Sequence, residues 1–325
     1  MSDSESRRVL IASDKFKGTL SAIEVCAALA TGFEAEGWSA DRCPLADGGE
    51  GTAAALIEAR GGELFQARAH DPLGRPIDSS FAVLADGLAV VEVAAASGIA
   101  LLAKAELDPL ESSTAGTGEL IVEAAKRAET VLVAVGGSAT TDGGLGAVRA
   151  IADAGGIGDV QLVCLCDVST PWEQAASTFG PQKGAGPEQV AALEKRMDDL
   201  AETLEKDPRG LIMSGAAGGL AGGLWAALDA TLIAGAGFVL DAVSFNSRAA
   251  GADLVITGEG RLDETTLQGK LVAEVSRRCA LLGVPVHAAV GEDALAAEGR
   301  EALGLAAVHE AGTPARLEGL AASLG

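Results

Sequence analysis

The chain has 325 residues, of which 48% are hydrophobic, so it can form two ordinary domains or one large domain with a substantial core. Its 46 acidic and 24 basic residues give a formal net charge of −22, which argues against nucleic acid or an anionic membrane surface as a partner. The five cysteines are unevenly spaced and suggest neither a disulfide framework nor a zinc site, so we expect a reducing, cytoplasmic location. We expect no targeting peptide and no membrane span, because the first residues are polar and no apolar stretch reaches about 20 residues without glycine.

Residues 8–62 contain two predicted strand–loop–helix units. Residues 8–13 form an apolar strand, and Ser21 with Glu24 forms a capping box that opens a helix running toward Gly37. Residues 39–46 form the second strand, and a helix over 52–59 follows and ends at paired glycines. In both units a polar loop follows the carboxyl end of the strand, which is where open parallel sheets bind ligands.

The middle of the chain has a different pattern. Residues 62–98 alternate in polarity and contain two turn signals, which predicts antiparallel strands. We then expect a helix over 118–128, a strand over 131–135, a helix over 145–152, a buried strand over 161–168 that contains Cys164 and Cys166, and an amphipathic helix over 187–206. Residues 215–230 form a second glycine-rich entry to a helix.

The last eighty or so residues return to the first pattern, with short buried strands over 252–260, 284–291 and 305–312 and a helix over 271–283. We therefore predict an α/β protein in which residues 1–62 and 246–325 form one parallel-sheet domain. Residues 63–245 would form an inserted mixed α/β domain. The active cleft is expected where the two domains face each other.

The segment from 130 to 150 is the most informative. Its apolar run enters paired glycines and then a helix, and this pattern favours an anion site built from backbone N–H groups at a helix start. The hydroxyls of Ser138, Thr140 and Thr141 accompany Asp142, whose carboxylate would suit a phosphate-bound Mg²⁺. The glycines that would permit close approach are Gly136, Gly137, Gly143 and Gly144. An ordinary strand-to-helix turn stays the alternative, because the segment matches neither a Walker loop nor a dinucleotide fingerprint.

Charged side chains follow several predicted strands. Asp14, Lys15 and Lys17 follow the first strand, and Asp47 and Glu50 follow the second. Glu259, Arg261 and Asp263 lie beyond the carboxyl end of the strand that begins near 252. Lys183 lies in a short loop after Asp167. Carboxylates combined with lysine and arginine would suit a Mg²⁺-nucleotide and an anionic acceptor, although each residue taken alone is equally compatible with a solvated loop.

Nine blocks of the sequence, in order from Leu10 to Lys270, together resemble the bacterial glycerate kinase family of the two-domain, glycerate 2-kinase-like type. The blocks are LIASDKFKGTLSAIEV, PLADGGEGTAAAL, DPLGRPI, SSTAGTGELI, VGGSATTDGGLGA, CDVSTP, FGPQKGA, GAAGGLAGGL and ADLVITGEGRLDETTLQGK. The resemblance implies a flavodoxin-like domain with an inserted second α/β domain. It also implies transfer of the γ-phosphoryl group of ATP to D-glycerate with Mg²⁺, usually to give 2-phosphoglycerate.

We therefore predict that Asp47 receives the proton of the acceptor hydroxyl and that Lys15 and Lys17 position anionic groups. Mg²⁺ would be held by Asp142, with Asp167 or Glu259 sharing the ion. The predicted substrate- and phosphate-binding residues are Asp14, Gly48, Gly49, Glu50, Thr117, Gly136, Gly137, Ser138, Thr140, Thr141, Gly143, Gly144, Lys183 and Arg261.

The chain departs from the family pattern at three places. The family more often has asparagine where this chain has Thr141, residues 150–160 are shortened, and the segment after CDVSTP lacks the usual glycine-containing loop. These changes lie near the predicted sites and bear on the acceptor and on the position of phosphorylation.

Two alternatives to glycerate kinase activity stay open. One is a kinase for another small hydroxy acid, because the shortened segment would reshape the acceptor site. The other is a non-catalytic sugar-acid sensor, although the sequence offers no linker, basic helix or coiled coil for an output. A nicotinamide oxidoreductase is disfavoured by the missing dinucleotide fingerprint, and a homodimer is compatible with the sequence.

Overall fold

The computed structural model describes residues 6–268 and 270–324. The chain separates into two compact units. The terminal unit contains the described parts of Met1–Asp47, Ala54–Ala59 and Ala236–Gly325, and the inserted unit contains Gly48–Ala53 and Arg60–Gly235. Helix α2 (Thr52–Arg60) contributes residues to both units.

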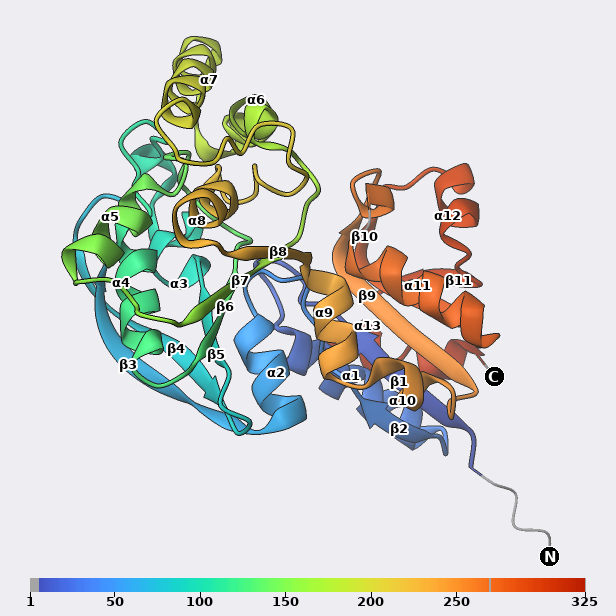
Figure 1. Ribbon diagram of the computed structural model, residues 1–325. Helices are drawn as coiled ribbons and strands as arrows, with labels where there is room; N and C mark the ends of the chain where they lie inside the picture. The colour runs from blue at the N-terminus through green and yellow to red at the C-terminus, as the bar shows by residue number, and fades with distance from the viewer. Residues whose placement is uncertain (1–5, 269, 325) are drawn as a thin grey trace, which may run out of the picture. The chain divides into compact units, whose positions relative to one another are not determined.

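The terminal unit is built on a five-stranded parallel sheet in the order β2-β1-β9-β10-β11 (Figure 1). Numbered along this unit, the order is 2-1-3-4-5, which is the flavodoxin-like arrangement. The predicted fold class is confirmed by this order together with the mixed sheet of the inserted unit. The strands are β1 (Arg8–Ser13), β2 (Ser39–Arg42), β9 (Leu254–Leu262), β10 (Val286–Asp293) and β11 (Ala307–Glu310).

Helices cover both faces of this sheet. One face packs Val9, Ile11 and Ile256 against α1 (Ala22–Ala35) and α13 (Pro314–Glu318). The other face packs Leu10 and Val255 against α9 (Gly235–Ala242), α10 (Phe245–Ala249) and α11 (Leu271–Leu282). Helix α12 (Ala297–Leu303) lies between β10 and β11 in the chain. The alternation of buried side chains along β1 thus fills two cores from one strand.

A local sequence signal explains where helix α1 begins, and strand β2 ends earlier than the sequence predicts. Helix α1 begins with the predicted capping box, in which Glu24 Oε2 accepts from Ser21 N–H at 2.8 Å and Ser21 Oγ accepts from Glu24 N–H at 3.3 Å. The regular part of the predicted second strand is shorter than expected, since β2 ends at Arg42, two residues before Pro44. Cys43 and Leu45 N–H groups still bond to β1, at 2.8 and 2.9 Å, and this carries the chain to the carboxyl edge of the sheet before Asp47.

The inserted unit has a six-stranded mixed sheet in the order β3-β4-β5-β6-β7-β8. The β3–β4 and β4–β5 pairs are antiparallel, as the alternation over 62–98 predicts, and the pairs from β5 to β8 are parallel. The strands are β3 (Gly62–His70), β4 (Pro76–Leu84), β5 (Ala89–Glu92), β6 (Thr130–Ala134), β7 (Gln161–Cys166) and β8 (Thr231–Ala234).

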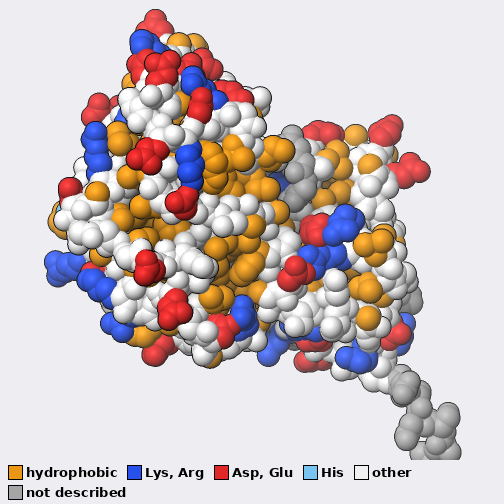
Figure 2. Space-filling model, viewed as in Figure 1, with side chains coloured by type: hydrophobic (Ala, Val, Ile, Leu, Met, Phe, Trp, Pro, Cys, Tyr) orange, Lys and Arg blue, Asp and Glu red, His pale blue; other side chains and the backbone are white. Residues whose placement is uncertain are grey.

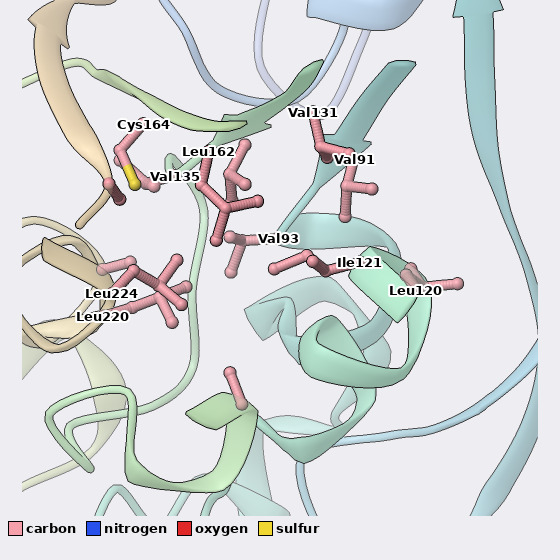
Figure 3. Close-up of a cluster of buried hydrophobic side chains, with 14 of the residues drawn as sticks. Val91, Val93, Leu120, Ile121, Val131, Val135, Leu162, Cys164, Leu220 and Leu224 are labelled. Carbon is pink, nitrogen blue, oxygen red and sulfur yellow. The ribbon is translucent and has the colours of Figure 1, made fainter. Parts of the chain in front are cut away.

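One core of the inserted unit packs the parallel strands against helices (Figure 3). Val91, Val131 and Leu162 of the sheet meet Ile121 and Leu224 of the helices in this core. Cys164 and Cys166 are buried in β7, as expected for a buried strand. The helices of the unit are α3 (Ala94–Ser97), α4 (Ala115–Ala125), α5 (Leu145–Asp153), α6 (Ala175–Phe179), α7 (Pro187–Ala201) and α8 (Leu220–Leu228).

The surface carries mixed charges. Figure 2 shows acidic and basic side chains close together around α7, where Lys195 and Asp199 form an exposed ion pair at 2.7 Å. Among residues 6–268 and 270–324, no helix has both the length and the apolar character that a membrane span needs.

Candidate active site

The first candidate site lies in the terminal unit, at the carboxyl ends of β1 and β9. The chain leaves β1 toward β2 on one side, and β9 pairs with β1 on the other, so the strand order reverses between these strands. Ligands of open α/β sheets bind at such a switch point. Asp14 follows β1, its N–H bonds to Gly258 O at 3.0 Å, and Glu259 is the next residue of β9.

Asp14 is a nearly buried acid, with 9% of its surface exposed. Its Oδ1 accepts from the Lys15 N–H at 2.7 Å, and the Lys15 ammonium lies 3.8 Å away. Burial, assisted by the negative charge of Asp47, raises the pKa of Asp14 to about 7 despite the opposing charge of Lys15. The structure therefore brings Asp14, Lys15, Asp47 and Glu259 into one electrostatic cluster.

Glu259 has a similar environment. Its Oε1 accepts from the Thr266 hydroxyl at 2.6 Å. Burial raises the pKa of Glu259 to about 7, against the Thr266 hydrogen bond and the charge of Lys270, with smaller raising effects from Asp263 and Asp47. Two carboxyl groups at the switch point thus titrate near neutral pH, where groups that exchange protons during catalysis work best.

The other predicted residues of this unit lie further out. Lys17 is exposed, and a Cβ on Gly260 would lie 2.9 Å from its backbone nitrogen, so glycine is required where the two segments touch. The Arg261 side chain is 56% exposed and donates to Glu292 Oε2 at 2.8 Å, with Asp263 Oδ2 at 3.5 Å. Arg261 is therefore engaged by acids at the surface.

The described residues contain no group of three or more His, Cys, Asp or Glu side chains placed to hold a metal ion. Mg²⁺ typically takes only one or two protein carboxylates and completes its shell with substrate oxygens and water. The oxygen donors of the first site suit this ion by chemical type, since carboxylates are the hard ligands it prefers.

The second candidate site lies in the inserted unit, at the carboxyl ends of β6 and β7. Gly136 follows β6 and Asp167 follows β7. A Cβ on Gly136 would lie 2.7 Å from Gly49 Cα and 3.3 Å from Asp167 Oδ2, and one on Gly48 would lie 2.9 Å from Leu165 O. Only glycine fits these approaches, and Gly48 also has a φ of +99°. The structure thus brings together Gly48, Gly49, Gly136 and Asp167.

Lys183 reaches this site from a short 3-10 helix over Pro181–Lys183. Its Nζ donates to Ser138 Oγ at 3.0 Å and to Thr140 O at 2.5 Å, and only 3% of its surface is exposed. Burial lowers the pKa of Lys183 to about 7, although the charges of Asp142 and Asp167 act in the opposite direction. A buried ammonium of this kind would be stabilised by a bound anion.

The loop that contacts Lys183 contains two buried hydroxyls without hydrogen-bond partners in the described part of the chain. Thr140 Oγ1 and Thr141 Oγ1 are buried, and neither has a hydrogen-bond partner among the described residues. Buried polar atoms are nearly always paired, and an orphan is explained by a role in strain, catalysis or the binding of water, an ion or a ligand. Residues 138–141 and Lys183 therefore form the best-supported anion site of the inserted unit.

Asp142 has a different environment from the one expected of a metal ligand. Its Oδ2 accepts from Thr114 N–H at 2.9 Å, from the Thr114 hydroxyl at 2.8 Å and from Gly146 N–H at 3.1 Å, while Oδ1 accepts from Gly144 N–H at 3.1 Å. The residue is 2% exposed. A metal ion would have to share or displace these donors, so the metal role of Asp142 stays a prediction that competes with a structural one.

The N–H groups at the start of α5 are also occupied. Gly143 N–H bonds to Gly218 O at 3.0 Å, in the second glycine-rich segment, and Ala147 N–H bonds to Thr114 Oγ1 at 3.0 Å. Together with the Asp142 contacts to Gly144 and Gly146, these bonds use the donors that a phosphate at the helix start would need. Phosphate binding by Gly143 and Gly144 stays a prediction, and a phosphate there would have to compete with these hydrogen bonds for the N–H groups.

Some relevant residues escaped the sequence reasoning. Glu92 accepts from the Ala53 N–H at the start of α2, and Thr114 accepts from the Ala147 N–H at the start of α5. In the sequence, only the position of these two residues beside predicted motifs pointed to them. The predicted Thr117 donates its hydroxyl to Ser97 Oγ at 2.7 Å and is fully buried in α4. Its contact is therefore with α3 of the same unit.

Comparison with known proteins gives consistent matches. A model of the glycerate kinase family matches residues 9–156 and 152–318. Glycerate kinase of Bacillus subtilis (strain 168) is 37% identical over 326 residues, covering 87% of this chain and 85% of that protein, and glycerate 2-kinase of Escherichia coli (strain K12) is 36% identical, covering 83% and 82%. A crystal structure from Salmonella typhimurium LT2, provisionally described as glycerate kinase 2, is 33% identical with a TM-score of 0.80 and covers 98% of this chain and 97% of its own.

Proposed function

We propose that this chain, which belongs to the glycerate kinase family, transfers the γ-phosphoryl group of ATP to D-glycerate with the help of Mg²⁺ and releases 2-phosphoglycerate. The chain is an enzyme, a glycerate kinase, and the resemblance seen in its nine sequence blocks is confirmed. The match of the family model to nearly the whole chain carries the proposal. The use of ATP, the requirement for Mg²⁺ and the release of 2-phosphoglycerate are our proposals.

In the terminal unit, we assign proton transfer to the carboxylates at the switch point. Asp47 would accept the proton of the acceptor hydroxyl, and its negative charge already raises the pKa of Asp14. Asp14 would hold the acceptor beside it, while Lys15 and Lys17 would attract anionic groups of the substrates. This assignment is supported by the common location of the acids at the carboxyl edge of the sheet.

In the inserted unit, we assign phosphate binding to Lys183, Ser138, Thr140 and Thr141. The support is the buried Lys183 ammonium and the unpartnered hydroxyls of Thr140 and Thr141 in the loop that it contacts. Gly48, Gly49, Gly136 and Gly137 would let backbone approach the phosphates closely.

The residues present suit Mg²⁺ by their chemistry. We propose Asp167 or Glu259 as a carboxylate ligand of the ion. The hydrogen bonds that Asp142 accepts favour a role in holding its loop over its predicted metal role. When bound, Mg²⁺ would neutralise charge on the transferring phosphoryl group. The cytoplasm stays our proposed location, because the five cysteines are unpaired, buried thiols.

The proposal is tested by measuring ADP release with purified enzyme, Mg²⁺ and ATP across D-glycerate, tartronate, lactate and other small hydroxy acids. Phosphorus NMR of the product then identifies the phosphorylated oxygen. The proposal predicts the highest kcat/KM with D-glycerate and a 2-phosphate product. Preference for another acid would favour the alternative kinase, and binding of acids without ADP release would favour the sensor.

A further inference from the structure

The segment Gly48–Ala53, which carries the predicted site residues Gly48, Gly49 and Glu50, is held by a carboxylate from the central part of the sheet. We propose that this carboxylate, Glu92, is a positioning residue for phosphoryl transfer. It would fix the segment at the carboxyl ends of β6 and β7. The inference rests on the proposed function, because it takes these loop atoms to contact substrate.

Glu92 makes two short contacts with the segment. Its Oε1 accepts from Gly51 N–H at 3.0 Å and from Ala53 N–H at 2.8 Å. Within the segment, the Thr52 hydroxyl donates to Gly49 O at 2.6 Å and closes the turn before α2. The carboxylate therefore caps the start of α2, where negative charge is favourable. The turn closed by Thr52 holds Gly49 just before this cap.

The source of this cap distinguishes it from ordinary helix capping. A local cap comes from the residue just before the helix, but Glu92 lies 41 and 39 positions away from its two partners in the sequence. Glu92 ends β5 and is paired with Ala134 of β6. Its contacts therefore fix the segment relative to the sheet as well as stabilising one helix turn.

The packing beneath the segment leaves little freedom. Gly48 lies against Leu165 O and Gly49 lies against Gly136, at distances that exclude even a Cβ atom. Asp167 Oδ2 lies near the same point. The segment is thus held by the close glycine contacts and by Glu92, and it lies near two further predicted site residues, Gly136 and Asp167.

The expected consequence is a loss of alignment when the carboxylate is removed. Catalytic geometry tolerates displacements of only about 0.5 Å, and a misplacement of about 1 Å costs on the order of 100-fold in rate. Substrate binding draws on many contacts and would change less. Removal of Glu92 should therefore lower kcat more than it raises KM.

The test compares Glu92→Ala, Glu92→Gln and Asp253→Ala. Asp253 is a matched control, because its Oδ2 likewise accepts from a backbone N–H group, that of Arg8, at 2.7 Å. This contact lies at the amino end of β1, whereas the candidate site of the same unit lies at the carboxyl end. Hydrogen–deuterium exchange across residues 48–56 and steady-state kinetics are measured for each. Glu92→Ala should exchange at least about ten-fold faster in this segment and lose about 10- to 100-fold in kcat, with KM changed less than about three-fold.

Glu92→Gln should keep kcat within about five-fold of wild type, because its amide oxygen can accept from the same two N–H groups. Asp253→Ala should leave both exchange and kcat unchanged. A folded Glu92→Ala variant with wild-type kcat, or with lowered kcat and unchanged exchange, overturns the inference.

If Glu92→Ala does not fold, Glu92→Asp decides, because it withdraws the carboxylate by one methylene. Faster exchange with lowered kcat then supports the inference, and wild-type values of both overturn it. The proposed function is judged separately by the wild-type enzyme, whose failure to phosphorylate any hydroxy acid contradicts that function and leaves the exchange comparison of the variants intact.

Discussion

Thr114 and Asp142 tie together the first turns of two helices. Asp142 Oδ2 accepts from both the N–H and the hydroxyl of Thr114, the residue before α4, at 2.9 and 2.8 Å. The Thr114 oxygen in turn accepts from Ala147 N–H in the first turn of α5, at 3.0 Å. The pair therefore satisfies donors at two helix starts that would otherwise be buried without partners.

Asp142→Asn should therefore destabilise the fold. Its new NH₂ group cannot accept, and unsatisfied buried donors cost about 1–3 kcal/mol each, so we expect a loss of about 2–4 kcal/mol in the free energy of unfolding. Denaturant unfolding measures this loss, with Asp199→Asn on the exposed surface of α7 as the control. In a Mg²⁺ titration of activity at saturating ATP, the variant's curve should have the wild-type midpoint. A midpoint shifted to higher Mg²⁺ with unchanged stability would instead make Asp142 a metal ligand.

Lys183→Met should change how stability depends on pH. The pKa of Lys183 is about 7 in the folded chain against 10.5 for a free lysine, mainly because of burial. Between these values the unfolded chain binds a proton that the folded chain does not, so this group makes stability rise with pH from about 7 to about 10.5. Relative to wild type, the variant should gain most stability at or below about pH 7, and its advantage should shrink toward pH 10.

Unfolding free energies of both proteins at several pH values check this prediction. Lys195→Met, which removes an exposed lysine, should show a pH-independent difference from wild type. A constant difference between wild type and Lys183→Met across the range would mean that Lys183 stays charged in the folded chain.

The sequence predicted the parts of this protein that depend on local patterns. The Ser21 capping box, the alternation over 62–98 and the buried strand with Cys164 each follow from residue spacing and are present in the structure. It could not predict the long-range partners. The same carboxylate of Asp142 would suit a metal ion or a helix cap, and only the positions of Thr114 and Gly146 reveal which donors surround it. The burial that perturbs Lys183 is likewise a property of the folded chain.

Lys17→Ala should impair catalysis while leaving the fold intact. Lys17 is exposed, so its removal creates no cavity, and its proposed role is to stabilise negative charge in the transition state. Loss of one such preorganised donor costs about 2–4 kcal/mol, which corresponds to roughly 30- to 1,000-fold in kcat/KM. Steady-state kinetics and thermal unfolding are measured beside Lys195→Ala, an exposed lysine on α7 that should behave as wild type. Unchanged kinetics for Lys17→Ala would remove this residue from the site.

Asp47→Asn should lower turnover and also shift the pH profile of the activity that remains. As the proposed proton acceptor, Asp47 is needed in the chemical step, so kcat should fall by about 100-fold or more while the affinity for nucleotide changes little. Its negative charge also raises the pKa of Asp14, and to a smaller extent that of Glu259. Removing that charge should lower both pKa values, so the acidic limb of the residual kcat/KM profile should move to lower pH. Nucleotide titration and pH–rate profiles test the two parts, and collapse of nucleotide affinity with an unmoved pH profile would assign Asp47 to binding instead of proton transfer.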